Sequence, residues 1–155
     1  MRFNNKPPEY YDYARVKLID MFPVVKGSYL DVGCRNGVTL EYLKTKGASY
    51  VAGIDVNGKT INKALQKSLD FFLVADVEKD NLPFKEREFD GIIFANILEH
   101  FYNPWDTLKK LTKYLKDDGY ILLNVINIKY YHILRKLIFH GLNTILSPVR
   151  NEYIS

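Results

Sequence analysis

The chain has 155 residues, 47% of them hydrophobic, which is enough for one globular domain with a sizeable core and excludes a mostly disordered protein. The net charge is +4, and the basic residues are scattered and form no Lys/Arg block, so nucleic-acid binding is not expected. The chain has no run of 18 apolar residues, so an integral membrane segment is not expected either. The start has no apolar signal core and Cys34 is the single cysteine, so a cytoplasmic location is expected.

Strands and helices are predicted to alternate along the chain. A helix is expected from about Glu9 to Met21, where apolar residues recur at helical spacing until Pro23. Apolar stretches predict five strands, at 28–33, 49–55, 71–76, 89–95 and 119–125. Helical patterns are found at 38–47, at 60–67, after an Asn103 N-cap, and at 129–141.

Strands that are apolar on both faces and alternate with helices are typical of a parallel sheet covered on both sides. We therefore predict an α/β fold, a doubly wound, Rossmann-like parallel sheet of about five strands with helices on both faces. The chain is predicted to be a single domain, 1–155. It would comprise a lead helix (1–26), a cofactor-binding core (27–127) and a C-terminal helical segment (128–155).

A glycine-containing loop follows the first predicted strand, with the sequence Asp31-Val-Gly33-Cys-Arg35-Asn-Gly37. A dinucleotide loop reads G-x-G-x-x-G and places a pyrophosphate on a helix N-terminus. The glycine order here differs. The acid at Asp31 would repel a phosphate, but it suits a ligand that carries an ammonium group. The loop therefore favours S-adenosylmethionine over NAD.

Polar residues also end the following strands. Asp55 ends the second strand, where a carboxylate can accept hydrogen bonds from both hydroxyls of a ribose. Asp76 ends the third and could accept a hydrogen bond from the exocyclic amine of adenine. The ligand crevice of such a sheet lies beyond the carboxyl ends of its strands, so an adenosine is expected across these tips. The alternative for both acids is a solvated strand end or a helix N-cap.

Five segments in order are similar to those of class I S-adenosylmethionine-dependent methyltransferases: "LDVGCRNG", "GIDVN", "VADVEKDNLPF", "FDGIIFANILEHFYNP" and "LKDDGYILLNV". The opening "PEYYDYARVKLIDMFP" resembles the lead helix of the branch associated with small molecules and glycans. The resemblance implies methyl transfer from S-adenosylmethionine to a small-molecule or glycan substrate.

The resemblance also implies roles for particular residues. Cofactor contacts are expected from Arg15, Asp31, Gly33, Gly37, Asp55, Val56, Asp76, Val77, Asn96 and Ile97. His100 is a candidate general base beside Glu99, and a hydrogen-bonded loop with no substrate role is an equal alternative. Some related quinone O-methyltransferases hold a metal there with a Glu…Glu-His cluster. Asn96 replaces the first carboxylate, so no metal site is expected.

Two features depart from the family pattern. Arg35 stands where glycine is usual, and we expect its side chain to point to solvent and leave the site open. No closing antiparallel hairpin is recognisable after residue 125. The strand 119–125 would then be a bare edge, so a homodimer through this edge or the C-terminal helix is expected. A catalytically weak or inactive cofactor-binding or interaction module is the alternative function.

Overall fold

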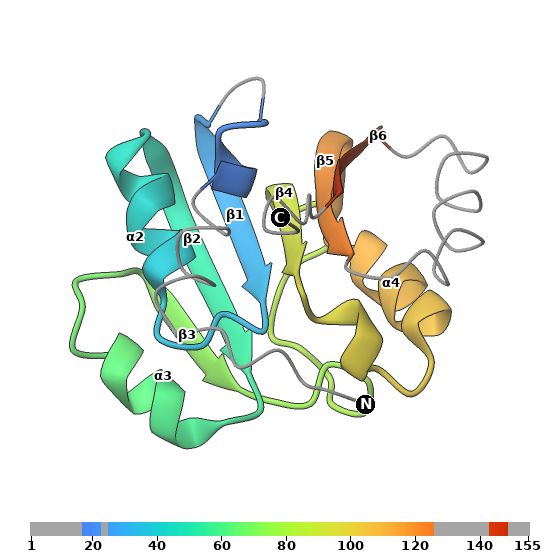
Figure 1. The fold of residues 1–155 in the computed structure, drawn as a ribbon, viewed down its shortest axis with the longest axis horizontal. Coiled ribbons are helices and arrows are strands. Elements are labelled where there is room, and N and C mark those ends of the chain that lie inside the picture. Colours follow the sequence, from blue (N-terminus) through green and yellow to red (C-terminus); the bar gives the residue numbers. More distant parts are fainter. Residues whose placement is uncertain (1–16, 23–24, 126–142, 149–155) are drawn as a thin grey trace, which may run out of the picture.

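The structure, a computed structural model, describes residues 17–22, 25–125 and 143–148. One sheet carries the strand order β3-β2-β1-β4-β5-β6 (Figure 1). All of its neighbouring strands are parallel. The strands are β1 (Gly27–Val32), β2 (Ala48–Asp55), β3 (Phe71–Val74), β4 (Phe89–Ala95), β5 (Leu115–Val125) and β6 (Asn143–Pro148). The predicted doubly wound parallel sheet is confirmed.

The sheet has one strand more than the sequence predicted. β6 pairs in parallel with β5 along six residues, from Tyr120↔Asn143 to Val125↔Pro148. The expectation that β5 is a bare edge is therefore wrong, and a homodimer through that edge loses its basis. No antiparallel strand pair occurs among the described residues. The predicted helix at 129–141 lies outside them.

The segment "NTILSP" was missed for a physical reason. It holds only two aliphatic residues in succession and ends in proline, so it shows neither a long apolar run nor a clear alternation. Its extended conformation depends on the neighbouring strand, because a strand's backbone groups are satisfied only by pairing.

In the described part of the chain, three α-helices and one short 3₁₀ helix lie between the strands: α2 (Val38–Thr45), α3 (Gly58–Ala64), η1 (Leu98–His100) and α4 (Pro104–Thr112). The predicted start of α4 is confirmed, because the Asn103 side chain accepts a hydrogen bond from the backbone N–H of Asp106 and Pro104 opens the helix. Of the predicted lead helix the structure describes residues 17–22, in which Leu18 and Ile19 are buried.

Helices cover both faces of the sheet, as the sequence predicted. Successive side chains of a strand point to opposite faces. On one face Leu30 packs in a core cluster with Leu108 and Leu111 of α4. On the other face Tyr29 packs in a second cluster with Leu40 of α2. With both faces covered, the ends of the strands are the places left for a ligand.

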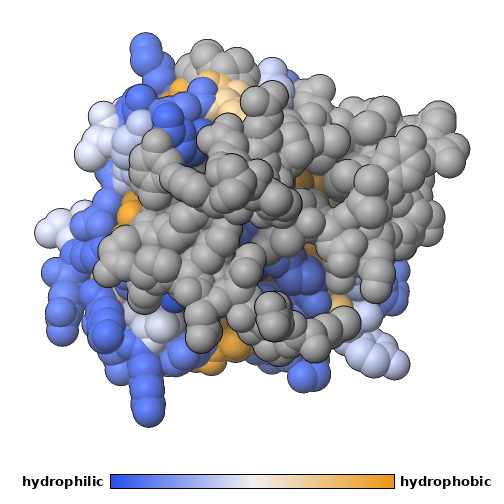
Figure 2. Space-filling view, in the orientation of Figure 1, coloured by the Kyte–Doolittle hydropathy of each residue, from blue (hydrophilic) through white to orange (hydrophobic). Residues whose placement is uncertain are grey.

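The outer surface on the side of α2 and α3 is mainly hydrophilic, with isolated hydrophobic residues among the described ones (Figure 2). None of the helices in the described part of the chain is long and apolar enough to span a bilayer.

Candidate functional site

A cavity of about 190 Å³ lies at the carboxyl ends of the first strands. In the sheet, β1 has β2 on one side and β4 on the other, so the chain switches direction across the sheet at β1. Ligands of doubly wound folds bind beyond such a switch point. The lining residues are Val32, Gly33, Ile54, Asp55, Val56, Ala75, Asp76, Val77, Glu78, Ile97, His100 and Phe101.

The cavity brings together part of the predicted set. The predicted residues that line it are Gly33, Asp55, Val56, Asp76, Val77, Ile97 and His100. The predicted residues that lie elsewhere in the described chain are Asp31, Gly37, Asn96 and Glu99. Arg15 lies outside the described residues.

The loop after β1 turns sharply at Gly33. This residue has φ +74°, and its N–H donates to the carbonyl of Ile54 at 2.7 Å. A Cβ atom at this position would lie 2.9 Å from Cδ1 of Ile97, closer than real Cβ contacts. Glycine therefore fits both the backbone conformation and the close approach of the loop to the segment after β4.

Arg35 occupies a left-handed conformation, with φ +52°. This conformation costs a non-glycine residue roughly 1–2 kcal/mol, which gives a physical reason for the glycine that is usual at this position. The backbone N–H of Arg35 donates to Oδ2 of Asp55 at 2.9 Å. Its side chain is partly exposed and is not part of the cavity lining. The backbone of Arg35 thus supports Asp55 while the side chain leaves the cavity open.

Asp55 ends β2 with both carboxylate oxygens anchored. In addition to the bond from Arg35, Oδ1 accepts the N–H of Asn57 at 2.8 Å. Each oxygen of a carboxylate can accept more than one hydrogen bond, so the group keeps acceptor capacity toward the cavity. The Asn57 side chain in turn accepts from Lys59 N–H and caps α3. Asp55 is therefore held in place at the tip of the strand.

Asp76 lies in the loop after β3 and is also held by neighbours. Its Oδ2 forms an ion pair with Nζ of Lys79 at 2.8 Å, and its Oδ1 accepts the N–H of Glu78 at 3.0 Å. The Lys79 side chain and, after it, the Glu78 N–H hold the pKa of Asp76 below its ordinary value. The group is therefore ionised at neutral pH, as an acceptor for an exocyclic amine needs to be.

The segment after β4 and the end of β5 carry buried oxygens of a different kind. Asn96 has φ +54°, and its N–H donates to the carbonyl of Asn124 at 3.3 Å. Oδ1 of Asn96, Oδ1 of Asn124 and Oε2 of Glu99 are buried and have no hydrogen-bond partner within the described part of the chain. Buried polar groups are rarely left unsatisfied, so these oxygens call for a ligand or water.

Asn124 was not singled out in the sequence, although its side chain is only 3% exposed. The available signal was a polar residue that interrupts the apolar stretch "YILLNV". His100, at the end of η1, is exposed and lines the cavity.

Asp31 is fully buried within β1, next to Gly53 of β2 and Ile93 of β4 in the strand register. Gly37 immediately precedes α2, and a Cβ atom there would lie 3.1 Å from Cζ of Phe72. No group of three or more His, Cys, Asp or Glu side chains among the residues described could hold a metal ion.

A family model described as a methyltransferase domain matches residues 9–144. The chain is 31% identical over 128 residues to a ubiquinone biosynthesis O-methyltransferase of Coxiella burnetii, covering 79% of this chain and 53% of the relative. It is 30% identical over 105 residues to the enzyme of that name from Neisseria meningitidis, covering 63% of this chain and 43% of the relative. The chain thus spans about half the length of these curated relatives.

Solved structures of methyltransferases are similar to this chain in fold. A Haloferax volcanii complex of the Trm112 methyltransferase activator with a methyltransferase matches at 27% identity and a TM-score of 0.63, over 72% of this chain and 50% of that one. A Methanococcus maripaludis protein, 16% identical, matches in fold with a TM-score of 0.62 over 91% of this chain and 76% of that one.

Proposed function

Because the chain belongs to the methyltransferase domain family, we propose that it transfers a methyl group from S-adenosylmethionine to a small molecule. The family membership confirms the resemblance found in the sequence, together with S-adenosylmethionine as the cofactor of the family. The observation that carries the proposal for this chain is the anchored carboxylate of Asp55 in the same cavity as Gly33 and Asp76.

These residues fit the adenosine part of the cofactor. Asp55 would accept hydrogen bonds from the ribose hydroxyls, and Asp76 would accept one from the adenine amine. The carbonyl of Val77 accepts from Lys110 at 3.0 Å, which holds this residue in place, and the N–H of Val77 would donate to an adenine ring nitrogen. Val56, 70% exposed, would cover one face of the nucleoside. The cavity is smaller than the roughly 300–1,000 Å³ of typical ligand sites, so it would hold only part of the cofactor.

When bound, S-adenosylmethionine supplies a methyl group on a sulfonium, which is already a good leaving group. The protein's contribution is then mainly to align the acceptor with that methyl group. Asn96 and Ile97 would border the methyl group. His100, which lines the cavity, would take the proton of an oxygen or nitrogen nucleophile, with Glu99 next to it.

Near the cavity, in the segment after β4 and at the end of β5, Asn96, Glu99 and Asn124 each carry a buried oxygen without a partner among the described residues, which supports an inference about the methyl acceptor. The amide oxygens of Asn96 and Asn124 can only accept hydrogen bonds, and so can the Glu99 oxygen when that carboxyl is ionised. A methyl acceptor that carries hydroxyl or amine donors would therefore complement them. Relatives named ubiquinone biosynthesis O-methyltransferase support an oxygen of a small molecule as the methylated atom. A glycan is the other acceptor class that the sequence suggested.

Three further parts of the proposal come from the sequence. The cytoplasm is the proposed location, since Cys34 is the single cysteine and is buried. A homodimer through the C-terminal segment, 128–155, stays a prediction. A weak or inactive cofactor-binding or interaction module, the alternative that the sequence left open, is the second candidate function.

Calorimetric titration with S-adenosylhomocysteine, and separately with NAD, tests the cofactor. We expect one-to-one binding of S-adenosylhomocysteine and no binding of NAD, and the reverse would contradict the proposal. Radiolabelled S-adenosylmethionine offered with hydroxylated aromatic compounds or with glycans then tests transfer. Label in an aromatic compound supports the small-molecule acceptor. Cofactor binding without transfer to either class favours the inactive module.

A further inference from the structure

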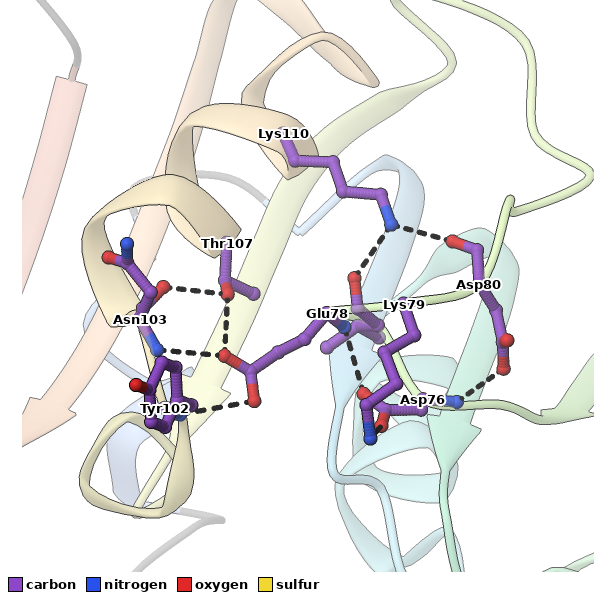
Figure 3. A network of polar contacts seen from close by, with 9 residues as sticks. Asp76, Glu78, Lys79, Asp80, Tyr102, Asn103, Thr107 and Lys110 are labelled. Atoms are coloured by element: carbon purple, nitrogen blue, oxygen red, sulfur yellow. Dashed lines mark hydrogen bonds and ion pairs between the residues drawn. The ribbon is translucent and has the colours of Figure 1, made fainter.

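Glu78 connects two segments that lie far apart in the sequence. It follows Val77 in the loop after β3, and it lines the cavity. Its Oε2 accepts the N–H of Tyr102 at 3.1 Å, and its Oε1 accepts the N–H of Asn103 at 2.9 Å and the hydroxyl of Thr107 at 3.3 Å (Figure 3). Both oxygens of one carboxylate are thus committed to the start of α4 and the residues before it.

A second link runs in the opposite direction. Nζ of Lys110, on α4, donates to the carbonyl of Val77 at 3.0 Å and to the carbonyl of Asp80 at 2.6 Å. Figure 3 shows the Glu78 and Lys110 side chains reaching across the same gap from opposite sides. We call this pair of links the Glu78–Lys110 clamp. Hydrogen bonds to charged groups are among the stronger ones in proteins, so the clamp fixes the two segments firmly.

Capping of α4 does not account for these contacts. The Asn103 side chain already caps the helix by accepting the N–H of Asp106. The donors to Glu78 include the N–H groups of Tyr102 and Asn103, which precede the first helical residue, Pro104. The carboxylate therefore holds the approach to the helix as well as its first turn.

The two segments that the clamp joins both line the cavity, and we call them the cofactor wall and the acceptor wall. The loop after β3 contributes Asp76 and Val77, the residues proposed to meet adenine. The segment before α4 contributes Ile97, His100 and Phe101, on the side proposed for the methyl acceptor. Glu78 and Lys110 therefore connect these two segments by hydrogen bonds in both directions.

Resting on the proposed function, we propose that Glu78 is a positioning residue. Together with Lys110 it sets the position of the segment before α4, the acceptor wall, relative to the loop after β3, the cofactor wall. Binding of the adenosine part of the cofactor then orders residues 97–103. Glu78 then affects the methyl acceptor through the position of the segment before α4, and not by contact with the reacting atoms.

Hydrogen exchange of the Tyr102 and Asn103 amides, resolved by NMR, reports directly on the bonds to Glu78. In the free protein we expect Glu78→Ala to speed their exchange about tenfold or more. Lys110→Met should also speed it, although Lys110 contacts neither amide. The controls are Glu86→Ala and Lys109→Met, which remove exposed charges of the same type nearby. Exchange in Lys110→Met equal to that of the parent would overturn the clamp.

S-adenosylhomocysteine separates positioning from simple stabilisation. In the parent, the ligand should slow exchange at Tyr102 and Asn103. In Glu78→Ala, ligand that still binds should no longer slow it, even where the unfolding midpoint matches the parent. Glu78→Gln, which keeps one acceptor oxygen, provides a second variant if Glu78→Ala does not fold, and it should lose part of the slowing. Undiminished slowing in both variants would overturn the coupling.

The two proposals fail in different ways. If the parent does not bind S-adenosylhomocysteine, the proposed function and the coupling to cofactor both fall, while the exchange rates of the free variants still decide whether the clamp joins the walls. If the parent binds but its Tyr102 and Asn103 amides do not respond, the coupling alone is overturned.

Discussion

Two regions at the carboxyl ends of the strands differ in how their polar side chains are satisfied. On the wall formed after β2 and β3, Asp55 and Asp76 each accept hydrogen bonds from backbone N–H groups. In the segment after β4 and at the end of β5, outside the cavity lining, Asn96, Glu99 and Asn124 each have a buried oxygen with no partner among the described residues. An unsatisfied buried group costs about 1–3 kcal/mol. The comparison indicates that the carboxylates after β2 and β3 are satisfied in the free protein, whereas the region after β4 and β5 leaves acceptors for donors from water or a ligand.

Removing Asp55 should have the largest effect on the free protein. Asp55→Ala takes the acceptor from the N–H groups of Arg35 and Asn57, so we expect a loss of about 1–3 kcal/mol in the free energy of unfolding. Urea unfolding without ligand measures it. Asp117→Ala is the control, because Asp117 is a 77% exposed carboxylate paired with Arg87, and it should change stability by less than about 0.5 kcal/mol. Equal stability of the two variants would show that the hydrogen bonds accepted by Asp55 do not stabilise the free protein.

Replacing Asn124 should act in the opposite direction. Leucine has the same branching as asparagine and no oxygen to leave unsatisfied, so Asn124→Leu is expected to raise the free energy of unfolding by about 1 kcal/mol. The matched control is Asn57→Leu, which removes a satisfied cap and should cost about 1 kcal/mol. A destabilised Asn124→Leu protein would show that this oxygen is already satisfied in solution.

A substitution of Arg35 tests whether cofactor binding depends on the side chain of this residue or on its backbone. Arg35→Gly keeps the N–H that supports Asp55 and relieves the left-handed strain. The affinity for S-adenosylhomocysteine should therefore change by less than tenfold, about 1.4 kcal/mol. Calorimetry measures it against the parent. A rescue from no detectable binding to micromolar binding would show that the arginine side chain blocks the site.

Acid should weaken the protein slightly through carboxylates at both ends of the sheet. Burial alone would raise the pKa of Asp90, but hydrogen bonds from Lys116 and Ser28 hold it below its ordinary value, and Lys79 and Glu78 lower that of Asp76. A carboxyl with a lowered pKa stabilises the fold above its ordinary pKa of about 3.9, and this contribution is lost as pH falls further. Unfolding between pH 5 and 2.5 should show a shallower acid loss in Asp90→Asn and Asp76→Asn, and an unchanged slope would contradict this.

The sequence was informative wherever a local pattern decides the structure. The strand before Gly33, the acid at the tip of β2 and the Asn103–Pro104 start of α4 are all recognisable from neighbouring residues. β6 was missed because its short segment is extended through pairing with β5.

Contacts between distant segments were also beyond the reach of local patterns. Glu78 was not singled out because its partners lie 24 to 29 residues further along the chain. That Asn124 Oδ1 has no partner among the described residues likewise depends on the packing around β5 and not on its sequence.

Calorimetric titration of S-adenosylhomocysteine into the parent, Asp55→Ala and Asn124→Leu tests the central claim most directly. If the wall after β2 and β3 holds the cofactor, Asp55→Ala should weaken binding by about 1–3 kcal/mol, since ribose hydroxyls lose their acceptor. Asn124→Leu, a change outside the cavity lining, should bind within about threefold of the parent, less than 1 kcal/mol. Equal binding by the parent and Asp55→Ala would contradict the placement of the cofactor.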